Sequence, residues 1–152
     1  MNYLLAIDPG TTQSGFVFMQ DRAVTRSGVL DNGMISHLCK EWKFDLAIEM
    51  VASYGMPVGK EVFETVRWTG RFQQAFWKPE NVKLIYRKDV KMHLCHSMRA
   101  KDPHVWQAIL DLYGGKDKAV GNKANPGPLY GVKSHARSAL AVALTARGAA
   151  ES

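Results

Sequence analysis

Residues 4–15, LLAIDPGTTQSG, carry a short apolar run into an acid at its end. Four apolar residues lead directly to Asp8, and Pro9-Gly10-Thr11-Thr12 then turns the chain away. Two interpretations fit this pattern. Asp8 is either a turn residue whose carboxylate accepts a hydrogen bond from a nearby backbone amide, or a metal ligand held at the end of a buried strand. The rest of the chain has to decide between them.

The length and composition are those of one globular domain. The chain has 152 residues, of which 46% are hydrophobic and 22% charged, and a chain of this size can bury a sizeable core. No apolar run approaches the roughly 20 residues of a membrane span, and MNYLLAID lacks signal-peptide features. Cys39 and Cys95 lie far apart, outside any C-x-x-C motif. We therefore expect a single domain over residues 1–152, cytoplasmic, with reduced thiols.

The charge of the chain favours an anionic partner. Twenty Lys and Arg against fourteen Asp and Glu give a formal net charge of +6 and a pI near 9.4. Nucleic acid is the first candidate and a membrane surface the second. Many basic proteins bind neither, so charge alone does not identify the partner.

Hydrophobic patterning predicts an α/β fold in which helices cover a mixed five-stranded sheet. The expected strands are residues 3–7, 15–19, 23–30, 44–50 and 82–87. The expected helices are residues 35–42, 59–77, 89–95, 101–115 and 134–147. Asp102 is the expected N-cap of the fourth helix, with Pro103 in its first turn. Residues 116–130 are basic and rich in Gly, Asn and Pro, so we expect a mobile loop there.

The helix expected over residues 59–77 has two different faces. The residues expected to face inward are Val62, Phe63, Val66 and Phe76. The outer, mostly basic stripe consists of Lys60, Arg67, Arg71, Gln74 and Lys78. Such a stripe is either a contact surface for an anionic partner or simply a solvated face.

Asp8 and Glu49 form a candidate pair, because each ends an apolar strand of the same pattern. If the two strands are parallel neighbours, both carboxylates emerge at one edge of the sheet, where parallel sheets place ligand sites. Carboxylates held that close repel each other unless a proton or a cation lies between them. Oxygen ligands suit Mg²⁺ or Mn²⁺, and two such ions can promote phosphodiester hydrolysis. The alternative is a turn aspartate and an unrelated strand-end glutamate.

Three segments together resemble the RuvC family of Holliday junction resolvases, which are RNase H-like nucleases, and in particular RuvC-like proteins of phages. The segments are AIDPGTTQSGFV (residues 6–17), LAIEMVASYG (46–55) and SHARSALAVAL (134–144). The resemblance spans roughly residues 3–146, with the motifs in family order. The first segment also resembles the phosphate-binding loop of sugar kinases, but those enzymes need two such domains and a far longer chain.

The resemblance implies an RNase H-like fold and a Mg²⁺-dependent site, with Mn²⁺ as a substitute and two ions per site. Asp8 matches the metal-bridging aspartate, and Glu49 matches the glutamate that ends the fourth strand. In the last helix the family carries two more site residues three apart, which here are His135 and Ser138. His135 matches a ligand or proton-transfer group; alternatively, it is a helix N-terminal residue satisfied by backbone.

Ser138 departs from the family, which has an Asp at that position. A neutral hydroxyl is a poorer ligand for Mg²⁺ than a carboxylate, so the second ion is bound weakly, through water, or by another acid. Glu61, Glu64 and Asp89 are the candidates for that acid.

The resemblance also implies where DNA is held. Lys91, Arg99 and Lys101 fall where resolvases place DNA-contacting basic residues, and Arg67 and Arg71 are weaker candidates. The loop after Glu49 would carry an aromatic wedge that stacks on bases at the junction centre.

That wedge would be Tyr54 or, failing that, Met56, although an ordinary loop tyrosine is an equal alternative. A two-fold symmetric junction calls for a homodimer. Phe72, Phe76 and Trp77 would form its surface, unless they belong to the core.

The sequence thus predicts an endonuclease that resolves four-way and related branched DNA by metal-dependent hydrolysis, without an organic cofactor. Its expected setting is the cytoplasm of a bacterial cell or a phage-infected host, in DNA recombination, repair or packaging. Two alternatives stay open. One is a junction-binding protein that cleaves weakly or not at all because of Ser138, and the other is an RNase H-like nuclease for other branched or hybrid nucleic acids.

Overall fold

The computed structural model describes residues 3–41 and 43–151. Its centre is a five-stranded mixed sheet in the order β3-β2-β1-β4-β5. The strands are β1 (Tyr3–Asp8), β2 (Gln13–Gln20), β3 (Ala23–Asp31), β4 (Asp45–Met50) and β5 (Lys83–Tyr86). The pairs β1–β2 and β2–β3 are antiparallel, whereas β1–β4 and β4–β5 are parallel. The predicted mixed sheet is therefore confirmed.

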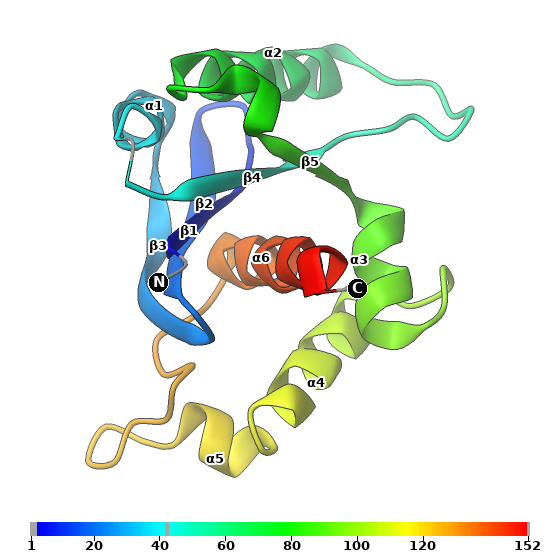
Figure 1. Ribbon diagram of the computed structural model, residues 1–152. Coiled ribbons are helices and arrows are strands. Elements are labelled where there is room, and N and C mark those ends of the chain that lie inside the picture. The colour runs from blue at the N-terminus through cyan, green and yellow to red at the C-terminus, as the bar shows by residue number, and fades with distance from the viewer. Residues whose placement is uncertain (1–2, 42, 152) are drawn as a thin grey trace.

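Helices cover both faces of this sheet (Figure 1). Helix α6 lies across one face, and α1 and α2 cover the other. The helices are α1 (Asn32–Cys39), α2 (Lys60–Ala75), α3 (Arg87–Cys95), α4 (Asp102–Leu112), α5 (Lys116–Val120) and α6 (His135–Glu151), with a 3₁₀ turn at Pro79–Asn81. In the described part of the chain, no helix has the length and apolar character that crossing a membrane requires.

The central strand β1 is buried on both faces, which explains its uninterrupted apolar run. Leu4 and Ala6 belong to the core cluster beneath α6. Leu5 and Ile7 alternate with them and belong to the cluster beneath α1 and α2. Two cores packed against opposite faces therefore fix the strand that carries Asp8.

Gly15 allows α6 to begin next to the end of β1. It pairs with Asp8 in the antiparallel β1–β2 register, and a Cβ atom built on it would overlap the backbone of His135. Only a residue without a side chain permits this approach. Gly15 thus brings the first residue of α6 beside the acid that ends β1.

Several element boundaries differ from those expected. Helix α1 begins before residue 35, because Asp31 caps it by accepting a hydrogen bond from the Met34 amide at 2.9 Å; Trp42 lies outside the described residues. Asp102 is the first residue of α4, and Lys101 occupies the N-cap position instead.

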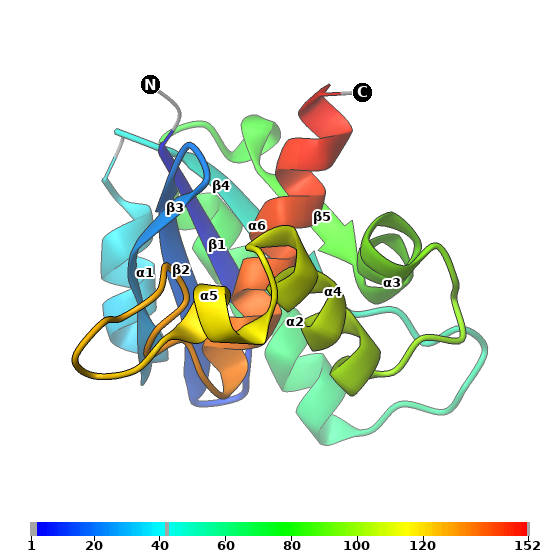
Figure 2. The ribbon, with the colours of Figure 1, turned by 90° about the horizontal axis from the view of Figure 1, so that it is seen from below.

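The segment 116–130 is not only a loop, because α5 occupies its start. Ala119 and Leu129 are buried in the core, and the Leu129 amide donates a hydrogen bond to the Ala119 carbonyl at 2.8 Å. Figure 2 shows α5 beside α4, and the loop that follows α5 extends away from α4. Burial of these two apolar side chains explains why the basic composition did not predict the local structure.

The prediction that Phe63 faces inward is wrong, since this side chain is 65% exposed. The part of α2 that packs on the core is its second half, through Phe72, with Phe76 just beyond the helix end. Phe72 and Phe76 are therefore core residues and are not available to a dimer surface. Of the three aromatics assigned to that surface, Trp77 alone is exposed, at 54%.

Substituting Gly15→Ala is expected to lower the free energy of unfolding by about 1–3 kcal/mol, the usual cost of overpacking a closely packed site. Urea unfolding followed by circular dichroism measures the change. Gly28→Ala is the matched control in the same sheet, because its Cβ atom would meet the Phe16 ring at an ordinary 3.4 Å. Equal stability of the two variants would contradict the role given to Gly15.

Candidate active site

Asp8 and Glu49 lie side by side at the carboxyl ends of two parallel strands. Ile7 pairs with Ile48 in the β1–β4 register, so the next residue of each strand is an acid. The two carboxyl groups are hydrogen-bonded to each other. The side chain of Asp8 is only 14% exposed. The structure thus brings together the two acids that the sequence pairs.

Burial is the largest cause that raises the pKa of both groups, since it disfavours their charged forms. The hydrogen bond and the charge of Asp8 raise the pKa of Glu49 further, to about 8. The same hydrogen bond lowers the pKa of Asp8. Glu49 therefore holds a proton near neutral pH and donates it in a hydrogen bond to the Asp8 carboxylate.

His135 contacts the pair from the first turn of α6. Its Nδ1 atom lies 3.0 Å from Asp8 Oδ2, and its side chain is 70% exposed. An ionised carboxylate only accepts hydrogen bonds, so Nδ1 donates and a neutral ring keeps its lone pair on Nε2. The alternative of a histidine satisfied by backbone is not what the structure shows.

Ser138 lies one turn along α6 from His135, as the spacing predicts. Both residues line a cavity of about 520 Å³ together with Arg87 and Asp102. A smaller cavity of about 180 Å³ is lined by the acid pair, Tyr54 and Arg87, among others. Arg87 therefore lines both cavities, and Tyr54 lines the same cavity as the acid pair.

The three acids proposed to replace the missing carboxylate do not serve that purpose. Glu64 lies on α2, with Oε1 3.9 Å from the Arg67 guanidinium. Glu61 is exposed in the first turn of the same helix, which covers the opposite face of the sheet from α6. Asp89 accepts a hydrogen bond from the Tyr86 amide at 3.1 Å and so caps α3.

The sequence interpretation missed two charged residues, Arg87 and Asp102, which form an ion pair. The positive charge of Arg87 lowers the pKa of both Asp8 and Glu49, and the negative charge of Asp102 raises both. A signal for Arg87 was present: it follows directly on β5, whose carboxyl end meets the same sheet edge as that of β4. The sequence contained no such signal for Asp102, because its position at the start of a helix indicated only a capping residue.

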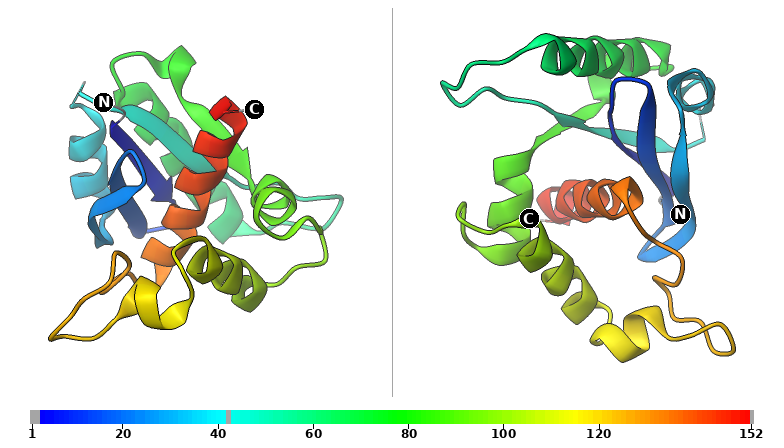
Figure 3. Two further views of the ribbon diagram at one scale, coloured as in Figure 1. Left: turned by 60° about the horizontal axis from the view of Figure 1, so that its bottom comes forward. Right: turned by 180° about the vertical axis from the view of Figure 1, so that it is seen from behind.

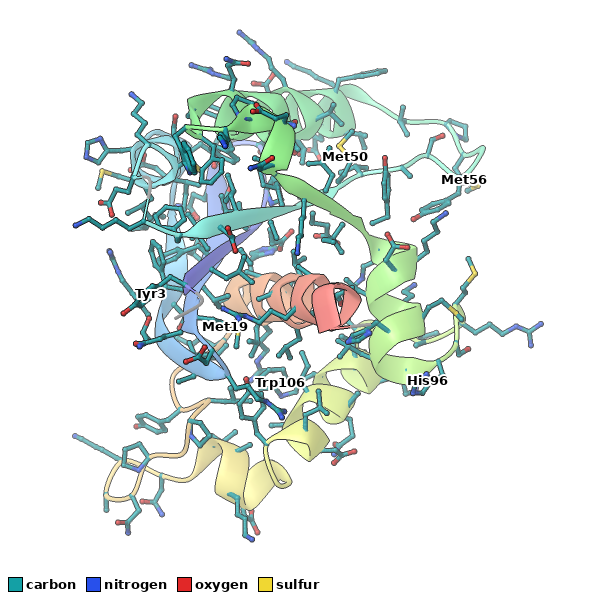
Figure 4. All side chains as sticks on the ribbon, in the orientation of Figure 1. Tyr3, Met19, Met50, Met56, His96 and Trp106 are labelled. Carbon is teal, nitrogen blue, oxygen red and sulfur yellow. The ribbon has the colours of Figure 1, made fainter. Side chains whose placement is uncertain are left out.

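The residues expected to contact DNA are spread over three regions, which are the β4–α2 loop, α3 with the segment that follows it, and α2. Tyr54 is 58% exposed on the β4–α2 loop and lines the smaller cavity. Figure 4 shows Met56 at the far end of the same loop, and this side chain is 69% exposed. The second group lies on α3 and just after it: Lys91 is half-buried, and Arg99 and Lys101 are exposed.

Arg67 and Arg71 lie apart from these residues, on the exposed face of α2. The Arg71 guanidinium stacks over the Trp68 ring at 4.2 Å. Figure 3 shows that α2 and α6 lie on opposite sides of the sheet. The structure therefore does not bring the α2 arginines together with the residues that follow α3.

The donor set fits a hard divalent cation. Two carboxyl groups that share a proton offer oxygen ligands, and Mg²⁺ typically binds to one or two protein carboxylates while water and substrate phosphate fill its remaining positions. Within residues 3–41 and 43–148, no group of three His, Cys, Asp or Glu side chains forms a preformed metal site. Asp8 and Glu49, with His135 beside them, are the residues that would hold such an ion.

In the absence of divalent metal, stability is expected to fall as the pH rises from about 5 to about 8. Folded Glu49 keeps its proton up to a pKa of about 8, against an ordinary value of 4.5. The folded state thus binds more protons than the unfolded state across this range, and the free energy of unfolding decreases with pH. Urea unfolding in EDTA measures this dependence.

The controls for this pH dependence are two glutamate substitutions. Glu49→Gln should remove most of the dependence, because the group that takes up the proton is gone. Glu80→Gln changes an exposed acid and should keep it. A wild-type stability that rises with pH over the same range would contradict the shared proton.

No protein-family model matches this chain, and no curated protein sequence does either. Solved structures do match. Thermus thermophilus RuvC in complex with a Holliday junction substrate is 20% identical, with a TM-score of 0.71, over 99% of this chain and 95% of that one. A second Thermus thermophilus RuvC structure is 20% identical, with a TM-score of 0.70, over 98% and 95%. The chain therefore has the RNase H-like fold of RuvC, as the sequence predicts.

Proposed function

We propose that this protein is a divalent-metal-dependent endonuclease that cleaves four-way and related branched DNA. One observation carries the proposal: Asp8 and Glu49 meet at the ends of adjacent parallel strands, and His135 Nδ1 lies 3.0 Å from Asp8 Oδ2. The comparisons support it through the fold shared with RuvC, one structure of which is in complex with a Holliday junction substrate. The basic charge of the chain suits a DNA partner.

The chemistry is hydrolysis of a phosphodiester. A water molecule attacks the phosphorus, the P–O3′ bond breaks, and products with a 5′-phosphate and a 3′-hydroxyl form. The proton that the water loses is balanced by the one that the 3′ oxygen gains. Mg²⁺ or Mn²⁺, when bound, supplies stabilisation of the negative charge that develops on the phosphate oxygens.

The residues of the site have distinct tasks in this reaction. Asp8 and Glu49 would hold the cations as carboxylates, with their shared proton released to solvent. Asp8 also orients His135, whose Nε2 atom takes a proton from the attacking water. Ser138 lies on the same helix face and adds a hydroxyl, which contributes little to cation binding.

The exposure and position of the candidate side chains determine which part of the DNA each would contact. Tyr54 stacks on bases opened at the junction centre, next to the acid pair whose cavity it lines. Lys91, Arg99 and Lys101 contact backbone phosphates on the α3 side. The two arginines of α2 contact more distant phosphates or simply face solvent.

Cleavage of opposed strands calls for two copies of the site, so we propose a homodimer. The core positions of Phe72 and Phe76 leave Phe63 and Trp77 as the exposed aromatics near the two ends of α2. We propose that Phe63 and Trp77, rather than the core side of α2, contribute to the dimer surface.

The second candidate function is junction binding without efficient cleavage. Ser138 favours it, because the helix lacks a carboxylate one turn after His135. It differs from the first in its response to metal: junction binding would be salt-sensitive, Mg²⁺ would not change it, and no cut would follow. A nuclease for flaps or RNA–DNA hybrids would instead show no preference for junctions.

Asp8→Asn is expected to abolish metal-dependent nicking of four-way DNA. The decrease should exceed the roughly 100-fold that follows removal of a residue that only supports a metal ligand, because the variant removes a ligand itself and the partner of His135. The assay uses immobile and mobile junctions, a flap, a hybrid and a linear duplex, each with Mg²⁺, Mn²⁺ or EDTA. Asp45→Asn, an exposed acid at the other end of β4, is the control. Cutting by Asp8→Asn at the wild-type rate would refute the proposal.

Arg99→Ala and Lys101→Ala are each expected to reduce the salt dependence of junction binding. The slope of log K against log salt should become shallower by about 0.9 for each phosphate that a variant no longer neutralises. Fluorescence anisotropy with labelled junction in EDTA measures the slope at several salt concentrations. Lys83→Ala, an exposed lysine at the start of β5, should leave it unchanged. An unchanged slope in both test variants would place the DNA elsewhere.

A further inference from the structure

The hydroxyl of Ser138 leaves the acid site with fewer oxygen ligands than two cations require. Ser138 and His135 share one face of α6 and line the same cavity. The side chain of Ser138 is half-buried there. A carboxylate from another element that lines this cavity would add a ligand for a second ion.

Asp102 is the acid that the fold places there. It is the first residue of α4, and it lines the cavity together with His135 and Ser138. Helix α4 packs beside α6: Arg137 of α6 lies over the ring of Trp106 of α4, 4.3 Å from the ring centre. Figure 4 shows Trp106 on the side of α4 that faces α6.

Arg87 links Asp102 to the acid pair. Its guanidinium forms an ion pair with Asp102, and the same side chain lines the cavity of Asp8 and Glu49. The charge of Asp102 acts on both of these acids and raises the pKa of each. The carboxylate of Asp102 therefore belongs to the same electrostatic site, although it comes from α4 and not from the helix of His135.

We infer that Asp102 supplies the metal-binding carboxylate that Ser138 lacks. The inference rests on the proposed nuclease function, because it assigns one more ligand to the same site. In the metal-free protein Arg87 neutralises Asp102, whose side chain is 81% exposed and so can turn. A divalent cation competes with Arg87 for this carboxylate, and the released guanidinium is then available to a DNA phosphate.

Direct Mn²⁺ binding, followed by the decrease of the free-ion signal in electron paramagnetic resonance, tests the inference without any cleavage assay. Asp102→Asn should weaken the second binding event by at least about 10-fold, the lower range for removal of a supporting group. Adding Ser138→Asp to this variant should restore the second Mn²⁺ binding event, because α6 then supplies the carboxylate. Asp111→Asn, an acid further along α4 that accepts a hydrogen bond from Gln107 at 3.0 Å, should bind as the wild type does.

Two further variants separate the possible outcomes. Arg87→Gln should leave Mn²⁺ affinity unchanged or tighter, since it removes a competing cation. If Asp102 only positions Arg87 for DNA, Asp102→Asn will weaken junction binding in EDTA and leave Mn²⁺ binding unaltered, which overturns the inference. If Asp8→Asn also binds Mn²⁺ like the wild type, the proposed metal site itself is wrong. Circular dichroism of each variant verifies that it is folded.

Discussion

The site is organised around two carboxyl groups that are held together away from water. The parallel pairing of β1 and β4 places Asp8 next to Glu49, and burial raises the pKa of both. Such a pair has two low-energy states, one with a shared proton and one with a shared cation. The charges of neighbouring residues influence which of these two states is more stable.

Backbone packing places the start of α6, and with it His135, beside the end of β1. Gly15 has no side chain, so the start of α6 lies directly against β2. Small buried residues such as Ala136 and Ala139 let the helix pack closely on the sheet. A site built from strand ends and a closely packed helix start holds its geometry more firmly than one built on loops.

The charges of Arg87 and Asp102 change the electrostatic potential at Asp8 and Glu49. The arginine favours the ionised carboxylates, and the aspartate opposes it. Because these two residues also form an ion pair with each other, any ligand that attracts one of them changes the field at Asp8 and Glu49. A DNA phosphate would attract Arg87, and a metal cation would attract Asp102. Binding of either ligand would therefore break the ion pair and leave the other residue available.

Local patterns in the chain were sufficient to predict the sheet and the pairing of two acids at its edge. An apolar run that ends in an acid occurs twice, and the rule that parallel strands end at one edge was enough to pair Asp8 with Glu49. The resemblance to the RuvC family assigned His135 and Ser138 to the site, and their spacing then placed both on one helix face. The exposure of Phe63 and the approach of Asp102 to the site became evident only in the folded chain. The physical reason is that burial and electrostatic contact depend on elements distant in the sequence, which no local pattern records.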